Sequence, residues 1–212
     1  MNRTVFLIDG FNLYHSLIDV RTFLRGASTK WLNINSLCSS YLPIIGNNAQ
    51  LSDIYYFSAL ATHLQHRFPQ KIARHRKFIR CIESFGINVE LGRFKQKNIN
   101  CPHCHNNITK YEEKETDVAI ASKLLELSFL DKYDTAVLVT GDTDLAPAAR
   151  SIKNIFCDKK VIFAFPYRRR SDELATLAPG SFSIGCNSCA RHQLPNPVVL
   201  ENGTRLFKPD SW

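Results

Sequence analysis

Long apolar runs are missing from this sequence. No stretch reaches the roughly 18 apolar residues that a membrane-spanning helix needs. The N-terminal segment MNRTVFLIDGFN meets Asp and Asn too early to hold the long apolar core of a signal peptide. Internal repeats and low-complexity tracts are also absent, which excludes solenoids and compositionally biased tails. We therefore expect a soluble, cytoplasmic protein with no membrane partner.

The seven cysteines, an odd number, do not have the pattern of a secreted disulfide framework. Three of them stand alone in apolar or helical contexts: Cys38, Cys81 and Cys157. The others form two CxxC pairs: Cys101 with Cys104, and Cys186 with Cys189. In a reducing compartment, paired CxxC spacing is typical of metal binding, and an isolated cysteine acts as a small apolar residue.

The two CxxC pairs predict a structural zinc site with four thiolate ligands. Alternative ligands are His103, His105 and His192. A redox pair and incidental cysteines remain open as other interpretations. Zinc at this place would tie the first pair to the C-terminal segment. It would not be a catalytic metal, because a closed site with four protein ligands has no open position.

The chain does have a surplus of positive charge. Lys and Arg number 27 and Asp and Glu 19, so the net charge is +8. Hydrophobic residues make up 44% of the 212 residues and charged residues 22%, which suits one folded domain or a domain with a small appendage. The basic balance favours a polyanionic partner, although a soluble basic protein without such a partner has the same composition.

Apolar strands alternate with amphipathic helices along the chain. Strands are expected over 4–9, 53–60, 87–94, 134–142 and 160–165. Helices are expected over 11–24, 68–85, 116–130, 143–156 and 171–178, with Thr116 and Ser171 as N-caps. This alternation predicts an α/β fold with a mostly parallel sheet, of strand order about 3-2-1-4-5, and helices on both faces.

The expected domain covers residues 1–185. Residues 95–115 interrupt the alternation and carry the first CxxC pair, so we expect a small zinc-knuckle insert there. Residues 186–212 are expected to form an irregular C-terminal segment that packs on the domain through its aromatic end, LFKPDSW.

Carboxylates follow two of the predicted strands. Asp9 ends the first strand, and Asp142 and Asp144 follow the fourth. Ligands of open parallel sheets bind beyond the carboxyl ends of the strands, at the point where the strand order reverses. Strands one and four are neighbours there, and Asp117 opens the helix that precedes strand four. We therefore expect these acids to converge on one crevice.

Converging carboxylates predict a divalent metal site, since Mg²⁺ or Mn²⁺ offsets their mutual repulsion. Asp9 and Asp142 are the main candidate ligands. Asp117 and Asp144 would complete the site or orient the attacking water, and Asn12 would hold a ligand or phosphate. Any one of these Asp residues could instead be a helix cap or turn residue, but the convergence of several favours the metal site.

Three segments resemble the NYN family of PIN-like nucleases, and its LabA-like bacterial branch in particular. They are IDGFN, EEKETDVAIASKLLE and VLVTGDTDLAPAAR, and they occur in the family's order within residues 4–180. The resemblance implies a Rossmann-like PIN fold and metal-dependent cleavage of RNA. It implies that Asp9, Asp117, Asp142 and Asp144 are catalytic metal-site acids. Lys114 stands where the family pattern often has Lys.

Basic and aromatic residues near the strand ends suit an RNA partner. The basic candidates are Arg93, Lys95 and Lys97, then Arg168, Arg169 and Arg170. They would contact the phosphate backbone. Phe11 and Tyr14 could stack on bases of single-stranded RNA. A solvated loop for Arg168–Arg170 and core packing for Phe11 are the alternatives.

Two other functions compete with a metal-dependent, endonucleolytic ribonuclease as interpretations of this sequence. A phosphatase of the haloacid dehalogenase type needs a second Asp two residues after the nucleophile, where this chain has Phe11. A non-catalytic RNA-binding or scaffold protein stays open, and so does a homo-oligomer. The four acids favour the enzyme, because concentrated negative charge does not help a protein that only binds phosphate.

Overall fold

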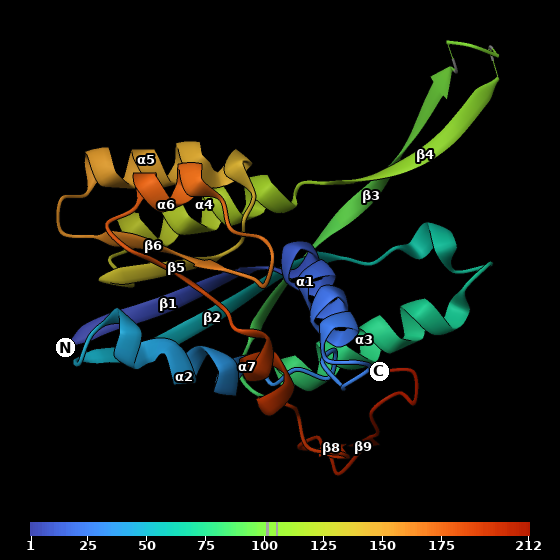
Figure 1. The fold of residues 1–212 in the computed structure, drawn as a ribbon, viewed down its shortest axis with the longest axis horizontal. Helices are drawn as coiled ribbons and strands as arrows, with labels where there is room; N and C mark the ends of the chain where they lie inside the picture. Colours follow the sequence, from blue (N-terminus) through green and yellow to red (C-terminus); the bar gives the residue numbers. More distant parts are fainter. Residues whose placement is uncertain (101, 105) are drawn as a thin grey trace.

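The computed structural model describes residues 1–100, 102–104 and 106–212, and a sheet of seven strands lies at its centre (Figure 1). The strands are β1 (Asn2–Asp9), β2 (Ala49–Ala59), β3 (Asn88–Asn100), β4 (Asn107–Lys114), β5 (Thr135–Val139), β6 (Lys160–Phe165) and β7 (Ser181–Ser183). The helices are α1 (Gly10–Phe23), α2 (Ile34–Ile45), α3 (Pro69–Glu83), α4 (Thr116–Phe129), α5 (Ala146–Ile155), α6 (Asp172–Leu177) and α7 (Cys186–Arg191). Two 3-10 turns, η1 (Thr62–Leu64) and η2 (Thr143–Leu145), and a small sheet of β8 (Val198–Val199) and β9 (Arg205–Leu206) complete the chain.

The sheet has the order β4-β3-β2-β1-β5-β6-β7. The five predicted strands are β1, β2, β3, β5 and β6. They lie side by side in the predicted order and are parallel. The sheet is wider than predicted, because β4 pairs antiparallel with β3 at one edge and β7 pairs parallel with β6 at the other. Neither edge strand has the apolar pattern of a buried strand.

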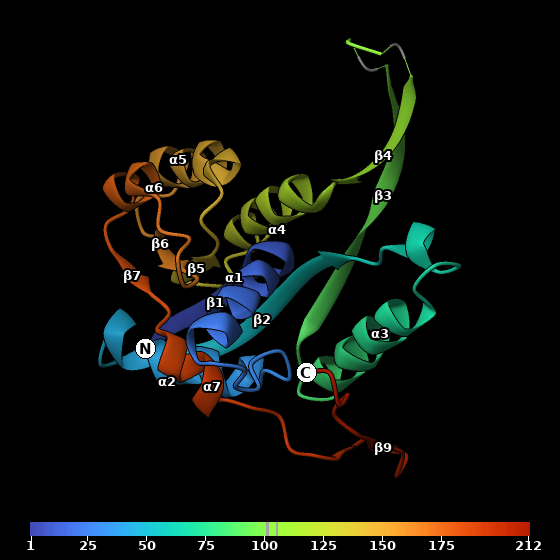
Figure 2. The ribbon, with the colours of Figure 1, turned by 45° about the vertical axis from the view of Figure 1, so that its right-hand side comes forward.

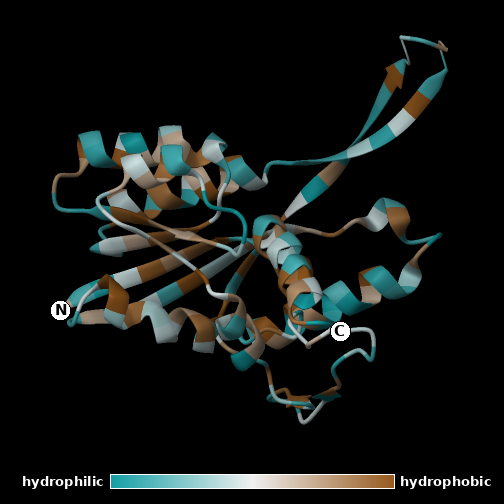
Figure 3. Cartoon of the chain, in the orientation of Figure 1, coloured by the Kyte–Doolittle hydropathy of each residue, from teal (hydrophilic) through white to brown (hydrophobic). Residues whose placement is uncertain are grey.

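Strand β1 is buried on both faces, which is why it reads as an unbroken apolar run. Val5 and Leu7 face the core beneath α4, α5 and α6. Phe6 and Ile8 face the opposite core, which α1, α2 and α3 cover. In Figure 3 the central strands carry many hydrophobic residues, and the helices that flank them alternate between hydrophobic and hydrophilic residues. The predicted layers, with helices on both faces of the sheet, are present.

Helix α2 was not expected from the sequence. Its N-cap is Asn33, whose Oδ1 accepts a hydrogen bond of 2.9 Å from the Ser36 backbone N–H. Pro43 lies inside the helix and several Ser residues dilute its apolar pattern, so the helical signal is weak. Thr116 is also not the N-cap that the sequence suggested. Glu115 precedes α4 with a φ of 83°, and the Thr116 hydroxyl donates to Glu113 instead.

Replacing Asn33 by Ala tests this cap. We expect Asn33→Ala to lower the free energy of unfolding by about 1 kcal/mol, because the Ser36 amide loses its acceptor. Urea denaturation of both proteins measures the change. Asn47→Ala, at an exposed turn position, serves as the control. Equal effects of the two substitutions would show that the Asn33 cap contributes nothing.

The expected zinc-knuckle insert at 95–115 is a β-hairpin. Strands β3 and β4 pair from Arg93 opposite Lys114 to Asn100 opposite Asn107, and the hairpin projects away from the sheet (Figures 1 and 2). Cys104 is exposed at its tip, whereas Cys101 and the alternative ligand His105 lie outside the described residues.

The second CxxC pair lies in α7, at the other end of the molecule from the hairpin tip in both views. Cys189 is fully buried in the core and behaves as an apolar side chain. Cys104 is therefore not brought to Cys186 and Cys189, which corrects the expectation of one zinc site shared by the two pairs. The reason is the hairpin ladder, which holds the tip away from α7.

The C-terminal segment returns to the domain at its aromatic end. The Trp212 ring packs edge-on against Trp31 and Phe78, with centroids 6.1 Å and 5.7 Å apart. The Arg21 guanidinium donates to the Ser211 carbonyl over 2.8 Å. These contacts place Trp212 beside α1 and α3. Among the described residues, no helix combines the length and the hydropathy that a membrane crossing requires.

Candidate metal centre

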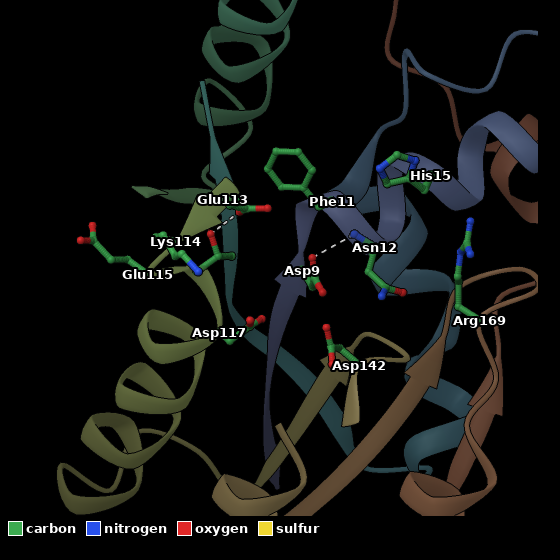
Figure 4. A pocket seen from close by; sticks show the side chains of 11 residues that line it. Asp9, Phe11, Asn12, His15, Glu113, Lys114, Glu115, Asp117, Asp142 and Arg169 are labelled. Carbon is green, nitrogen blue, oxygen red and sulfur yellow. Dashed lines mark hydrogen bonds between the residues drawn. The ribbon is translucent and has the colours of Figure 1, made fainter. Parts of the chain in front are cut away.

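The predicted acids meet at the carboxyl ends of β1 and β5, which are neighbouring parallel strands. Asp9 is the last residue of β1 and the N-cap of α1, and Asp142 is the N-cap of η2. A cavity of about 360 Å³ opens between them. Figure 4 shows Asp9, Asp117 and Asp142 around this cavity, each from a different element. We call it the acid cavity.

Asp9 is held rigidly at the floor of the acid cavity. It is only 6% exposed, and its two oxygens accept hydrogen bonds from the Asn12 backbone N–H at 2.9 Å and the Thr140 hydroxyl at 3.0 Å. The Thr140 oxygen in turn accepts from the Asp142 backbone N–H at 3.0 Å. Burial raises the pKa of Asp9, the two hydrogen bonds oppose that shift, and the charge of Asp142 adds to it.

The other three acids form a tighter group. Carboxylate oxygens of Asp117, Asp142 and Asp144 all lie within 4.8 Å of one another. The Asp144 backbone N–H donates to Asp142 Oδ1 over 3.0 Å, which fixes the turn. Burial raises the pKa of Asp117, and the charges of the neighbouring acids raise it further. The structure thus brings three predicted acids to one point, and two of them, Asp117 and Asp142, share the wall of the acid cavity with Asp9.

Two acids that the sequence did not predict for this site, Glu113 and Glu115, also line the acid cavity, and Glu113 is the more buried of them. It lies in β4 and accepts a hydrogen bond from the Thr116 hydroxyl. Burial and the charges of Asp9 and Asp117 raise the pKa of Glu113 to about 7. Only the pairing of β4 with β3, which sets Glu113 opposite Phe94, brings it to the cavity. Within the run EEKE it looks like any exposed charge.

The Glu113 carboxyl predicts a pH dependence of stability in the metal-free protein. Its pKa is near 7 when folded and close to the ordinary 4.5 when unfolded. The folded state therefore holds the proton more tightly, and the free energy of unfolding should fall as the pH rises from about 4.5 to 7. Glu113→Gln, which keeps an acceptor for Thr116, should weaken this decline. Urea denaturation at a series of pH values measures the decline, and Glu201→Gln, at an exposed position, is the control. If the free energy of unfolding falls equally with pH in the wild type and in Glu113→Gln, the prediction is wrong.

Asn12 and Gly141 fix the loop that carries Asp142. The Asn12 side-chain oxygen accepts from the Gly141 backbone N–H over 3.1 Å. A Cβ added at Gly141 would lie 1.9 Å from the carbonyl oxygen of Arg169. The loop after β5 and the loop after β6 are therefore packed backbone against backbone. Asn12 lines the acid cavity, but its oxygen already holds this loop.

Only part of the predicted RNA-binding set lines the acid cavity. Phe11, Lys114 and Arg169 do. Lys114 pairs with Glu112 at 3.1 Å, and Arg169 with Asp19 at 2.9 Å. Tyr14 faces a second cavity. The remaining five predicted RNA-binding residues do not line the acid cavity as the described residues form it. Arg93, Lys95 and Lys97 lie on the β3–β4 hairpin, and Arg168 and Arg170 follow β6.

The fold resembles that of a solved structure. A protein of unknown function from Vibrio parahaemolyticus RIMD 2210633 matches with a TM-score of 0.53 at 17% identity, over 87% of this chain and 93% of that one. A curated protein, 6-hydroxy-3-succinoylpyridine 3-monooxygenase HspA of Pseudomonas putida (strain DSM 28022 / S16), is 28% identical. The alignment covers 99% of this chain and 75% of HspA.

The family model of the NYN domain matches residues 3–184. This range holds the sheet from β1 to β7, apart from the first residue of β1, and every acid of the acid cavity. The chain therefore belongs to the NYN domain family, a family of PIN-like nucleases.

Proposed function

We propose that this protein is a metal-dependent ribonuclease that cuts RNA phosphodiester bonds endonucleolytically, in the cytoplasm. The observation that carries the proposal is the group of Asp117, Asp142 and Asp144, whose oxygens lie within 4.8 Å of one another at the edge of the sheet. Membership of the NYN domain family supports the same activity.

The donor set fits a hard divalent cation. All of its side-chain ligands are carboxylate oxygens, which Mg²⁺ and Mn²⁺ prefer. The cations on the cavity wall, Lys114 and Arg169, are already paired with Glu112 and Asp19. The negative charge of the cluster is therefore left for a metal to neutralise.

The residues of the chain suggest a division of roles. Asp117, Asp142 and Asp144 would hold the cation, and Asp9 would stand behind them, fixed by Thr140. When bound, Mg²⁺ or Mn²⁺ would polarise the phosphate and favour deprotonation of the attacking water. Glu113, whose pKa is about 7, is suited to accept that proton on a carboxylate oxygen at neutral pH.

The deciding experiment is cleavage of labelled single-stranded RNA and DNA of one sequence, with Mg²⁺, Mn²⁺ or EDTA. We expect RNA to be cut only when a metal is present. A circular RNA, which has no ends, should also be opened, because the proposed activity is endonucleolytic. If no substrate is cut and the affinity for RNA is the same with metal and with EDTA, the proposed nuclease activity is rejected. A non-catalytic RNA-binding protein is then favoured.

The name of HspA suggests a second candidate function, oxygenation of a small aromatic acid. Two observations favour it: the alignment with HspA covers 99% of this chain, and a second cavity adjoins the acid cavity. A monooxygenase consumes O₂ and a reductant. Uptake of O₂ and oxidation of a reduced nicotinamide on adding 6-hydroxy-3-succinoylpyridine would support this candidate, and no uptake would reject it for that substrate.

A further inference from the structure

A second cavity, of about 390 Å³, lies next to the acid cavity and shares Phe11 and His15 with it. Its walls come from α1, the segment between α1 and α2, the end of β2, η1, α3, Phe94 of β3 and the C-terminal residues Ser211 and Trp212. The volume is in the range of about 300–1,000 Å³ that small-molecule sites occupy. The proposed nuclease function does not use this space. We call it the aromatic cavity.

Aromatic rings form a large part of its wall. Tyr56 packs edge-on against Phe78 at 6.3 Å, and Phe78 packs against Trp212 at 5.7 Å. The Tyr14 ring lies beneath the Lys30 ammonium at 5.3 Å. Fixed aromatic faces and edges favour a flat aromatic ligand, which can stack on one ring and meet the edge of another.

Unpaired positive charge gathers at the same cavity. Lys30, Lys71 and Arg74 all line it. Within the described part of the chain, none of the three forms an ion pair with a carboxylate. Burial and the nearby charges of Arg21, Arg74 and Lys71 lower the pKa of Lys30. An anion bound there would relieve this repulsion.

Two histidines add neutral polar atoms to the wall. Burial and the charge of Lys71 lower the pKa of His75 to about 4, so its imidazole is neutral at pH 7. His63 Nδ1 is buried and has no hydrogen-bond partner in the described structure. Both side chains line the aromatic cavity and can bond heteroatoms of a ring.

We propose that the aromatic cavity binds a planar aromatic ring that carries a carboxylate or phosphate. The ring would lie against Tyr56, Phe78 and Trp212, and the anionic group would face Lys30, Lys71 and Arg74. Two sources supply this chemistry: a nucleotide, free or within a nucleic acid, and a free aromatic acid. The proposal does not depend on nuclease activity, because it concerns residues outside the acid cluster.

Binding is measured directly, with EDTA present so that the acid cavity holds no metal. Trp212 lines the aromatic cavity, and the chain has only two tryptophans, so quenching of their fluorescence reports occupancy. The probes are AMP, UMP and nicotinate. Adenosine, a ring without an anion, and ribose 5-phosphate, an anion without an aromatic ring, are the controls. At least one probe should bind saturably and about tenfold more tightly than either control.

Substitutions decide whether the site is the aromatic cavity. Lys30→Met and Arg74→Met should each weaken binding of that probe about tenfold, because each removes one unpaired cation. Arg76→Met, on the exposed side of the same helix α3, should leave it unchanged. A preference for AMP or UMP identifies a nucleotide as the ligand, and a preference for nicotinate identifies a free aromatic acid. No saturable binding, or binding that neither Lys30→Met nor Arg74→Met weakens, overturns the proposal.

Discussion

Asp142→Asn should reduce metal-dependent RNA cleavage by at least about a hundredfold. Loss of a residue that only supports a metal ligand costs roughly 10–100-fold in affinity or activity, and loss of a ligand charge should cost more. Asn keeps the size of Asp and an oxygen that can still accept from the Asp144 backbone N–H. The expected loss therefore reflects the missing negative charge in the cluster, not a disturbed turn.

Single-turnover cleavage across a titration of Mn²⁺ measures this effect. If Asp142 acts as a ligand, the variant should need more metal and still cut more slowly at saturation. Asp158→Asn provides a matched control, because Asp158 is 79% exposed and precedes β6 at the opposite end of the strands. Cleavage by Asp142→Asn at the wild-type rate would remove Asp142 from the proposed site.

Gly141→Ala should have the second largest effect, although it changes no charged or polar group. The new Cβ would lie 1.9 Å from the Arg169 carbonyl oxygen, which is backbone and cannot rotate away. One of the two loops has to move, and the Asn12–Gly141 hydrogen bond at 3.1 Å moves with it. We expect a loss of about 1–3 kcal/mol in the free energy of unfolding from overpacking.

The same shift should displace Asp142 from Asp117. Since metal sites tolerate little displacement of their ligands, we expect roughly 10–100-fold weaker metal binding. Urea denaturation and a Mn²⁺ titration measure the two effects. Gly180→Ala is the control, because nothing lies within 4 Å of a Cβ built there. Metal affinity equal to that of Gly180→Ala would show that the Gly141 contact does not position the acids.

The centre of the sheet was predictable because its strands β1 and β5 are buried. Strands such as β1 and β5 pack on both faces, and so their sequences are apolar without interruption. Once their order follows from the crossover rule, the convergence of Asp9 and Asp142 follows from topology alone. The structure brings Asp117 and Asp144 to the same place.

The hairpin and the residues that depend on it were not predictable in the same way. Strand β4 is largely exposed and pairs only with β3, at one edge of the sheet. Its sequence, NITKYEEK, therefore lacks the apolar pattern that identifies a buried strand. Glu113 was missed for this reason. The prediction of a shared zinc site was wrong for a different reason. The spacing within a CxxC pair shows that its two thiols are close to each other, but it does not show where in the fold each pair lies. Cys104 and Cys189 are carried to separate parts of the molecule.

The projecting β3–β4 hairpin has a consequence for how this family member can change over evolution. Its tip lies beyond the sheet, so insertions or deletions near Cys104 alter an exposed turn and little else. Its base is different, because Glu113 is the second last residue of β4 and Gly92 of β3 has no room for a side chain beside the Lys114 carbonyl. Residues can therefore be inserted at the tip of the β3–β4 hairpin without disturbing the acid cavity. A deletion that reaches Glu113, in contrast, removes an acid from that cavity.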